Sequence, residues 1–322
     1  MKLNSLFLHF AILLAAVSIV GCNHSRPVVP CDIDTDEVYK PIPPNEESSP
    51  NELTFGKKNI PGFIFDTEMT TENSDIYIYF NNLTVLDINP SINQSIFDFI
   101  QDQLKEFGFV NDSVSLQKNE FETLIKEGMN FSDAAARILD FQKNCFEAQY
   151  DTIASYNSPF NIYFQIYPVY LDEKYVTYRE SSYCYTGGAH GMTESNLFTY
   201  DLTTGNLMTL EDIVKPESMD EVREEVAAHM AYSYPIYENI TTVEQYIDSL
   251  NVWLGDSSES DASSHDNRIT LKNYPLPTPA LTDEGLAFVY QMYVLTPGSD
   301  GCPIIVIPYR DIRGCLFDYI GK

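Results

Sequence analysis

The chain has 322 residues, of which 47 are Asp or Glu and 19 are Lys or Arg, so its net charge is −28. Its hydrophobic content of 44% is that of a globular protein and excludes a wholly disordered chain. The acidic balance argues against a nucleic-acid partner, because phosphate binding requires a basic face.

The N-terminal segment has the features of a bacterial lipoprotein signal. Lys2 precedes an apolar run over residues 6–20, a length that suits a signal-peptide core and is short for a membrane span. The run ends in Ile19-Val20-Gly21-Cys22, which resembles the lipobox. We therefore expect residues 1–21 to be removed and Cys22 to be lipidated, which places the protein in the cell envelope outside the cytoplasm. A plain secretory signal with an incidental cysteine is the alternative.

Residues 22–50 are rich in proline and poor in large apolar side chains. Proline-rich segments stay extended and act as semi-rigid spacers. This stretch is therefore expected to be a tether that holds a folded body away from the lipid surface.

Periodicity and turn residues predict the elements of the body. Strands are expected over 75–80, 83–88, 160–167, 174–185, 196–200, 206–209, 268–272, 286–294 and 304–308. Helices are expected after the capping boxes at Ser91, Ser218 and Thr242, and over 132–150. Because strands and helices do not alternate regularly, the pattern predicts an α+β fold with mainly antiparallel sheets and segregated helices.

Near residue 190, a glycine-rich motif lies between two predicted strands: Tyr185-Thr186-Gly187-Gly188-Ala189-His190-Gly191. Four more segments follow in order, at residues 198–205, 210–213, 281–286 and 307–312. Together they resemble the bacterial extracytoplasmic family called domain of unknown function 3298. Residues 51–183 are similar to the domain of unknown function 4163 that usually precedes it. The resemblance implies two consecutive subdomains, residues 51–183 and 184–322.

This tandem occurs in the outer region of the RsiV-type anti-sigma factor, a lysozyme sensor, and ahead of the catalytic domain of certain peptidoglycan deacetylases. The resemblance implies an envelope-facing binding module. A lipobox stands where the anti-sigma factor has a cytoplasmic segment and a membrane span, and Lys322 is reached without a deacetylase domain. Neither sigma-factor control nor deacetylation is therefore expected.

The sequence carries no familiar catalytic motif. His-Glu-x-x-His and G-x-S-x-G are absent, so no enzyme is expected and no cofactor is implied. His190 could act as a base, fix its turn through backbone carbonyls or contact a ligand, and Tyr185, Gly187 and Gly188 are binding candidates beside it. The loop 256–267 lacks the glycine and glutamate that a calcium loop requires, so it is interpreted as a solvated acidic loop.

Five cysteines remain after Cys22, and an oxidising compartment permits disulfides. Cys302 and Cys315 flank one short segment and are the expected pair. The chain has no C-x-x-C and no paired histidines, so the cysteines do not indicate a zinc site.

Residues 216–267 hold 12 Asp and Glu and a single basic residue, Arg223. Helical spacing opposite Val222, Val226 and Met230 predicts an exposed acidic face, made of Glu217, Asp220, Glu221, Glu224 and Glu225. Because the resemblance is to a lysozyme-binding module and lysozymes are basic, the leading hypothesis is a non-enzymatic, lipid-anchored module that binds a basic protein. The alternatives are a peptidoglycan or glycan-binding module and a hydrolase that uses His190.

Overall fold

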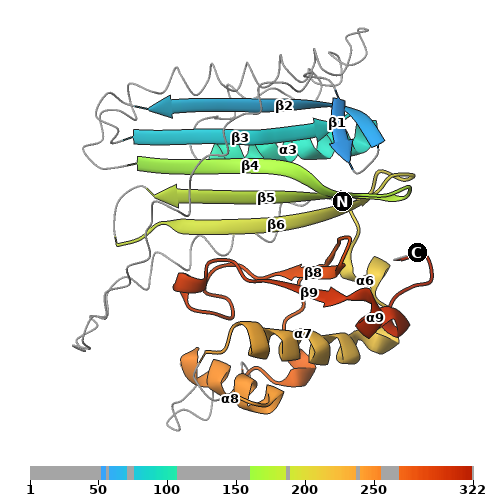
Figure 1. Ribbon diagram of the computed structural model, residues 1–322. Coiled ribbons are helices and arrows are strands. Elements are labelled where there is room, and N and C mark those ends of the chain that lie inside the picture. Colours follow the sequence, from blue (N-terminus) through green and yellow to red (C-terminus); the bar gives the residue numbers. More distant parts are fainter. Residues whose placement is uncertain are drawn as a thin grey trace. The chain divides into compact units, whose positions relative to one another are not determined.

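The computed structural model describes residues 52–55, 58–70, 76–106, 160–185, 189–236, 240–254 and 268–320. Its first sheet has six strands that lie side by side in chain order (Figure 1). They are β1 (Glu52–Phe55), β2 (Lys58–Thr70), β3 (Ile76–Leu86), β4 (Phe160–Leu171), β5 (Tyr175–Tyr185) and β6 (Met192–Asp201). All neighbouring pairs are antiparallel except β3 and β4, which are parallel.

The expected signal peptide (1–21), Cys22, the tether (22–50) and the helix over 132–150 lie outside the described residues. Within them, the structure confirms the α+β fold with mainly antiparallel sheets.

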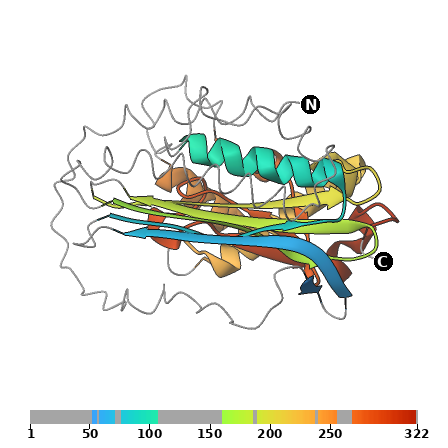
Figure 2. The same cartoon turned by 90° about the horizontal axis from the view of Figure 1, so that it is seen from above.

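The alternation along β4 assigns the two faces of the first sheet. Ile162, Phe164 and Ile166 are at most 1% exposed. They face helix α3 (Pro90–Glu106), whose Phe99 ring lies 6.4 Å from that of Phe164 and 4.9 Å from that of Phe198 on β6. Figure 2 shows α3 along one face of the sheet. The other residues of β4 therefore line the opposite face.

β3 is one strand where the sequence predicts two, over 75–80 and 83–88. Its register with β4 shifts between Phe80 and Leu83, and Asn82 has a left-handed φ of 53°. The Thr84 hydroxyl donates a 2.7 Å hydrogen bond to Asn82 Oδ1 across this irregularity. The bulge keeps both halves in the sheet, so the polar Asn-Asn pair does not end the strand.

The expected boundary between residues 183 and 184 lies inside β5, which pairs with β6 from Tyr175 to Cys184. Ser48–Lys322 forms one compact unit. The change from the first sheet to the second part of the fold follows Asp201, where β6 ends. Gly205, with a φ of 72°, then completes the turn that the sequence predicts.

The second sheet has three antiparallel strands, β7 (Ala280–Leu281), β8 (Gly285–Val289) and β9 (Ile304–Pro308). Its helical elements are α6 (Leu210–Ile213), η2 (Pro216–Ser218), α7 (Met219–Ser233), α8 (Val243–Trp253), η4 (Leu271–Asn273), η5 (Gly298–Asp300), α9 (Tyr309–Ile312) and η6 (Arg313–Cys315). Their shared core includes Met230, Tyr246, Leu250, Phe288 and Ile307. The strand expected over 268–272 is wrong, because Thr270 caps η4 there.

Helix starts follow the sequence only in part. Thr242 caps α8 as expected, accepting a 3.2 Å hydrogen bond from the backbone N–H of Gln245. Ser218 makes no such bond, because it is the last residue of η2 and its φ and ψ of −105° and 4° are not those of an N-cap. Asn89, and not Ser91, caps α3: its Oδ1 accepts from the Ser91 N–H, and Pro90 takes the first helical position.

The outer edge of β6 is covered at Ser195 by a side chain. Gln291 Nε2 donates to Ser195 O over 2.7 Å, and its Oε1 accepts from Ser195 N over 3.3 Å. The amide thus takes the hydrogen bonds that a seventh strand would make. Such cover protects a sheet edge from pairing with another chain.

Candidate functional site

The acidic residues predicted on one helix face lie where the spacing places them. Asp220, Glu221 and Glu224 are exposed on α7, and Glu217 is exposed in η2 just before it. Glu225 is half-buried. The opposite side of α7 is buried in the core through Val222, Val226, Ala227 and Met230. The amphipathic pattern is confirmed, and we call these five carboxylates the α7 acidic face.

Two of these carboxylates have local partners. Arg223 Nη1 lies 2.6 Å from Asp220 Oδ1. His229 Nδ1 donates to the backbone carbonyl of Glu225 over 2.9 Å, with the Glu225 carboxylate 4.0 Å away. Arg223 offsets one of the five negative charges of this face, which leaves the carboxylates in excess. The α7 acidic face therefore stays strongly negative.

One aromatic side chain extends the same face. Tyr232 follows Glu225 by about two helical turns and is 89% exposed. Tyr234 and Trp253 pack against the core. Tyr232 is therefore the aromatic side chain that α7 offers to a partner.

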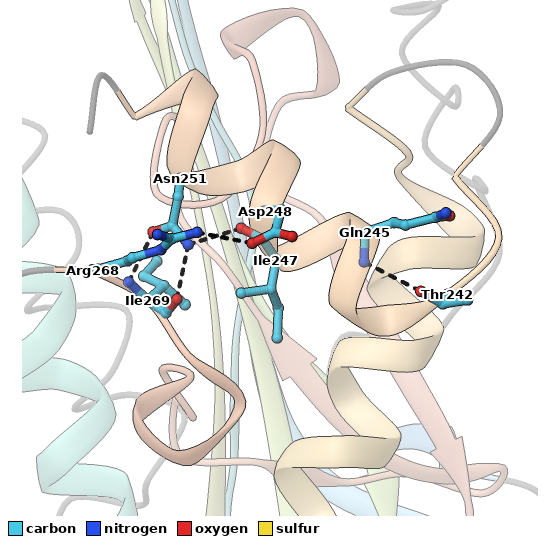
Figure 3. Close-up of polar contacts among 7 residues, drawn as sticks. All are labelled: Thr242, Gln245, Ile247, Asp248, Asn251, Arg268 and Ile269. Carbon is cyan, nitrogen blue, oxygen red and sulfur yellow. Dashed lines mark hydrogen bonds and ion pairs between the residues drawn. The ribbon is translucent and has the colours of Figure 1, made fainter. Parts of the chain in front are cut away.

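Helix α8 fixes one end of the acidic loop (Figure 3). Asn251, which is 4% exposed, donates from Nδ2 to the carbonyls of Ile247 and Ile269 and accepts at Oδ1 from Ile269 N, all within 2.9 Å. Arg268 Nη2 lies 2.9 Å from Asp248 Oδ1. Both contacts join α8 to the residues that follow the loop. The loop 256–267 lies outside the described residues, so its interpretation as a solvated acidic loop and not a calcium loop stays a prediction.

The glycine-rich motif is described at both of its ends. Tyr185 ends β5 and is half-buried, while Gly187 and Gly188 lie outside the described residues. His190 is exposed, and its Nδ1 donates to Gly191 O over 3.1 Å. Its Nε2 then accepts from the Tyr293 hydroxyl at 3.2 Å. These bonds match a turn-fixing histidine, the simplest of the roles expected for it.

Tyr293 is the site residue that the sequence did not reveal. Its ring centroid lies 5.9 Å from that of His190, and its φ of 67° is rare for a bulky residue. Across the motif, a Cβ on Gly191 would overlap the ring of Tyr183, so the backbone must approach that ring as glycine. His190 thus contacts a tyrosine that is 103 residues away in the sequence, and the next residue, Gly191, lies against Tyr183. Because His190 lies on the loop after β5, its surroundings form a site that is separate from the α7 acidic face.

A cysteine nucleophile beside His190 is disfavoured. Burial raises the pKa of the Cys184 thiol, and the nearby Glu194 carboxylate raises it further. A thiol of raised pKa holds less of the reactive thiolate at neutral pH.

The expected Cys302–Cys315 disulfide is wrong, since both are free thiols. Strand β9, helix α9 and the start of η6 lie between the two cysteines, and each thiol has its own surroundings. Cys302 Sγ instead donates to Thr193 O over 3.2 Å, and Cys315 is buried in the core.

The part of the chain that the structure describes contains neither a metal cluster nor a membrane span. No group of three or more His, Cys, Asp or Glu side chains there is arranged to hold a metal ion. No described helix is both long enough and apolar enough to span a membrane.

Part of this chain resembles one known family. Residues 211–310 match the family model described as Protein of unknown function (DUF3298). A solved DUF3298-family structure from Bacteroides fragilis is 15% identical, covers 80% of this chain and 94% of that chain, and has a TM-score of 0.50. Another from Pseudomonas aeruginosa is 18% identical, covers 80% and 95%, and has a TM-score of 0.45. No curated protein matches the sequence. The likeness to DUF3298 is confirmed for residues 211–310, and the likeness of residues 51–183 to domain 4163 stays a prediction.

Proposed function

We propose that this chain, whose residues 211–310 match DUF3298, is a non-enzymatic binding module of the cell envelope that recognises a basic protein through the α7 acidic face. The observation that carries the proposal is the arrangement of that face. Its exposed carboxylates, those of Glu217, Asp220 and Glu224 above all, are carried by or lie just before a helix whose other side is locked into the core, so they are presented on a rigid element.

The charge distribution supports a cationic partner. The molecule carries a net charge of −28, and residues 216–267 contribute 12 acidic side chains against one basic side chain. A surface of one sign raises the rate of encounter with an oppositely charged protein by about 10–10³-fold. It adds association rate and specificity more than tight binding.

Tight binding requires a desolvated anchor as well, and tyrosine is enriched at such positions. Tyr232 meets this requirement because it stands beyond the last carboxylate of the α7 acidic face and is almost fully exposed. We propose that the carboxylates steer the partner and that Tyr232 is buried by it. Lysozyme is the leading partner, on the resemblance to the outer region of the RsiV-type anti-sigma factor.

The test is association kinetics with a basic lysozyme at low and high salt. The variant replaces all five carboxylates by their amides: Glu217→Gln, Asp220→Asn, Glu221→Gln, Glu224→Gln and Glu225→Gln. Its matched control makes the same change of charge at five exposed acids elsewhere: Asp283, Glu284, Asp300, Asp311 and Asp318. The α7 variant should lower the association rate by about 10-fold at low salt, and the control by much less.

Two results would reject this proposal. One is the absence of lysozyme binding at low salt. The other is an equal effect of the two five-site variants, which would show that overall charge and not the α7 acidic face matters.

We also propose that the module is tethered to a membrane by lipid on Cys22. Cys22→Ala should leave the protein as a precursor or as a released form in a membrane fractionation. If the variant stays in the membrane fraction as firmly as wild type, the anchor is not at Cys22.

A further inference from the structure

One histidine lies within the surface that the proposed function assigns to the partner. His229 follows Glu225 by four residues and precedes Tyr232 by three, and residues at these spacings are neighbours on a helix surface. The side chain of His229 is 35% exposed. His229 therefore stands between the last carboxylate of the α7 acidic face and the exposed ring of Tyr232.

The hydrogen bond of the imidazole determines which nitrogen can take up a further proton. Nδ1 lies 2.9 Å from the backbone carbonyl oxygen of Glu225. Because a carbonyl can only accept, Nδ1 carries the proton of the uncharged ring. Nε2 has no hydrogen-bond partner among the residues that the structure describes. A second proton would therefore bind at Nε2 and leave the bond to Glu225 intact.

The charged group within ion-pair distance of the ring belongs to α7 itself. The carboxylate of Glu225 lies 4.0 Å from Nδ1 of His229. Strand β9, which packs against α7, carries no ionisable side chain. The other elements in contact with α7 contribute ionisable groups that are not paired with His229: Glu244, Tyr246 and Asp248 on α8, Lys272 on η4, Glu217 on η2, and Arg313 and Cys315 on η6.

Protonation of His229 would change the charge of the α7 acidic face at the point where a partner contacts it. Histidine is the side chain whose charge ordinarily changes between about pH 5 and 8. Arg223 already offsets one of the five negative charges, and a protonated His229 beside Glu225 would offset a second. The new positive charge would also lie next to Tyr232, where a cationic partner would bring like charges together.

We infer that His229 makes the binding of a basic protein by the α7 acidic face dependent on pH. The partner is held while the imidazole is uncharged, and it is released in acid when the imidazolium forms. This inference rests on the proposed function and adds regulation to the same site. The envelope location proposed above would expose the site to the pH of the surroundings.

The experiment measures the Kd for a basic lysozyme at about pH 7.5 and 5.5, near the two ends of the range in which histidine titrates. The ionic strength is kept constant. For wild type, the Kd should rise by about 3–10-fold at the lower pH, because like charges then meet at the contact. His229→Gln stays uncharged and should remove this rise, while His229→Lys stays charged and should bind at pH 7.5 as weakly as wild type does at 5.5.

The matched control is His190→Gln, which removes the other histidine of the described residues from a separate site and should keep the pH dependence of wild type. Any titration of lysozyme itself affects all four proteins equally. The inference is overturned if His229→Gln loses as much affinity at low pH as wild type, or if His229→Lys binds as tightly as wild type at pH 7.5. In either case lysozyme still binds, so the proposed function stands. Absence of lysozyme binding to wild type at pH 7.5 would reject both.

Discussion

The hydroxyl of Thr199 donates a 2.8 Å hydrogen bond to that of Thr177, its cross-strand partner on β5. The direction follows from the backbone of Leu281 on β7. Leu281 N donates to Thr199 Oγ1 over 3.0 Å, and Thr177 Oγ1 donates to Leu281 O over 2.7 Å. Since each hydroxyl has one proton, the bond between them must run from Thr199 to Thr177. This closed, buried ring of hydrogen bonds joins the first sheet to the second.

Breaking that ring should destabilise the fold. Thr199→Val leaves the buried Leu281 N–H without its acceptor, so the free energy of unfolding should fall by about 1–3 kcal/mol. Thr199→Ser keeps the hydroxyl and should restore most of it, while Thr203→Val on an exposed turn should have little effect. Urea unfolding of the three variants measures this. Equal stability of the valine variants at 199 and 203 would show that the ring adds nothing.

Gly285 begins β8 opposite Pro308, and a Cβ there would overlap the carbonyl of Ile307. Gly285→Ala should therefore cost about 2–3 kcal/mol, because the backbone of β9 cannot move aside without losing its pairing. Gly314→Ala is the matched control, since a Cβ on Gly314 would meet no other atom within 4 Å. Thermal unfolding should separate the two variants, and a shared melting temperature would contradict the close approach.

Substitutions at Asn251 and Arg268 test which contact attaches the residues after the acidic loop to α8. Asn251→Ala removes three hydrogen bonds from a buried side chain and should lower the free energy of unfolding by about 2–3 kcal/mol. Arg268→Gln removes an ion pair whose side chains are 51% and 70% exposed, and should cost about 0–1 kcal/mol. Denaturant titration gives both values. If Arg268→Gln lowers the free energy of unfolding more than Asn251→Ala does, the ion pair and not the buried amide holds these residues.

A cluster of buried tyrosines should make the protein sensitive to alkali. Burial raises the pKa of Tyr246 to about 12, and burial also raises the pKa of Tyr274 and of Tyr290. An unfolded tyrosine ionises near pH 10, so the unfolded chain loses protons first and stability falls as pH rises above about 10. Below that pH this contribution is fully present.

Tyr246→Phe removes one of these ionisable groups and should lose about 2 kcal/mol less stability than wild type between about pH 9 and 12. Tyrosinate absorbance during alkaline unfolding provides the measurement, because the buried rings should ionise together with unfolding. Parallel stability curves for the two proteins would show that Tyr246 does not contribute.

Local patterns in the sequence determined the faces of individual elements. Period two over 160–167 separated the core residues of β4 from its tyrosines, and helical spacing placed Glu224 outside and Val226 inside on α7. Gly205 indicated the turn after β6, because the left-handed φ of 72° that the turn requires is a local property that glycine adopts readily. Such features depend on the neighbours of a residue along the chain, so they can be read before the fold is known.

Only the tertiary structure decided which distant residues meet. His190 and Tyr293 are 103 residues apart, and Thr177 and Leu281 are 104 apart. Cys302 and Cys315 are close in sequence, yet both are free thiols, because the fold brings Cys302 to the carbonyl of Thr193 and buries Cys315 in the core. Contacts of this kind depend on strand order and on the register of each pair, and hydrophobic periodicity fixes neither.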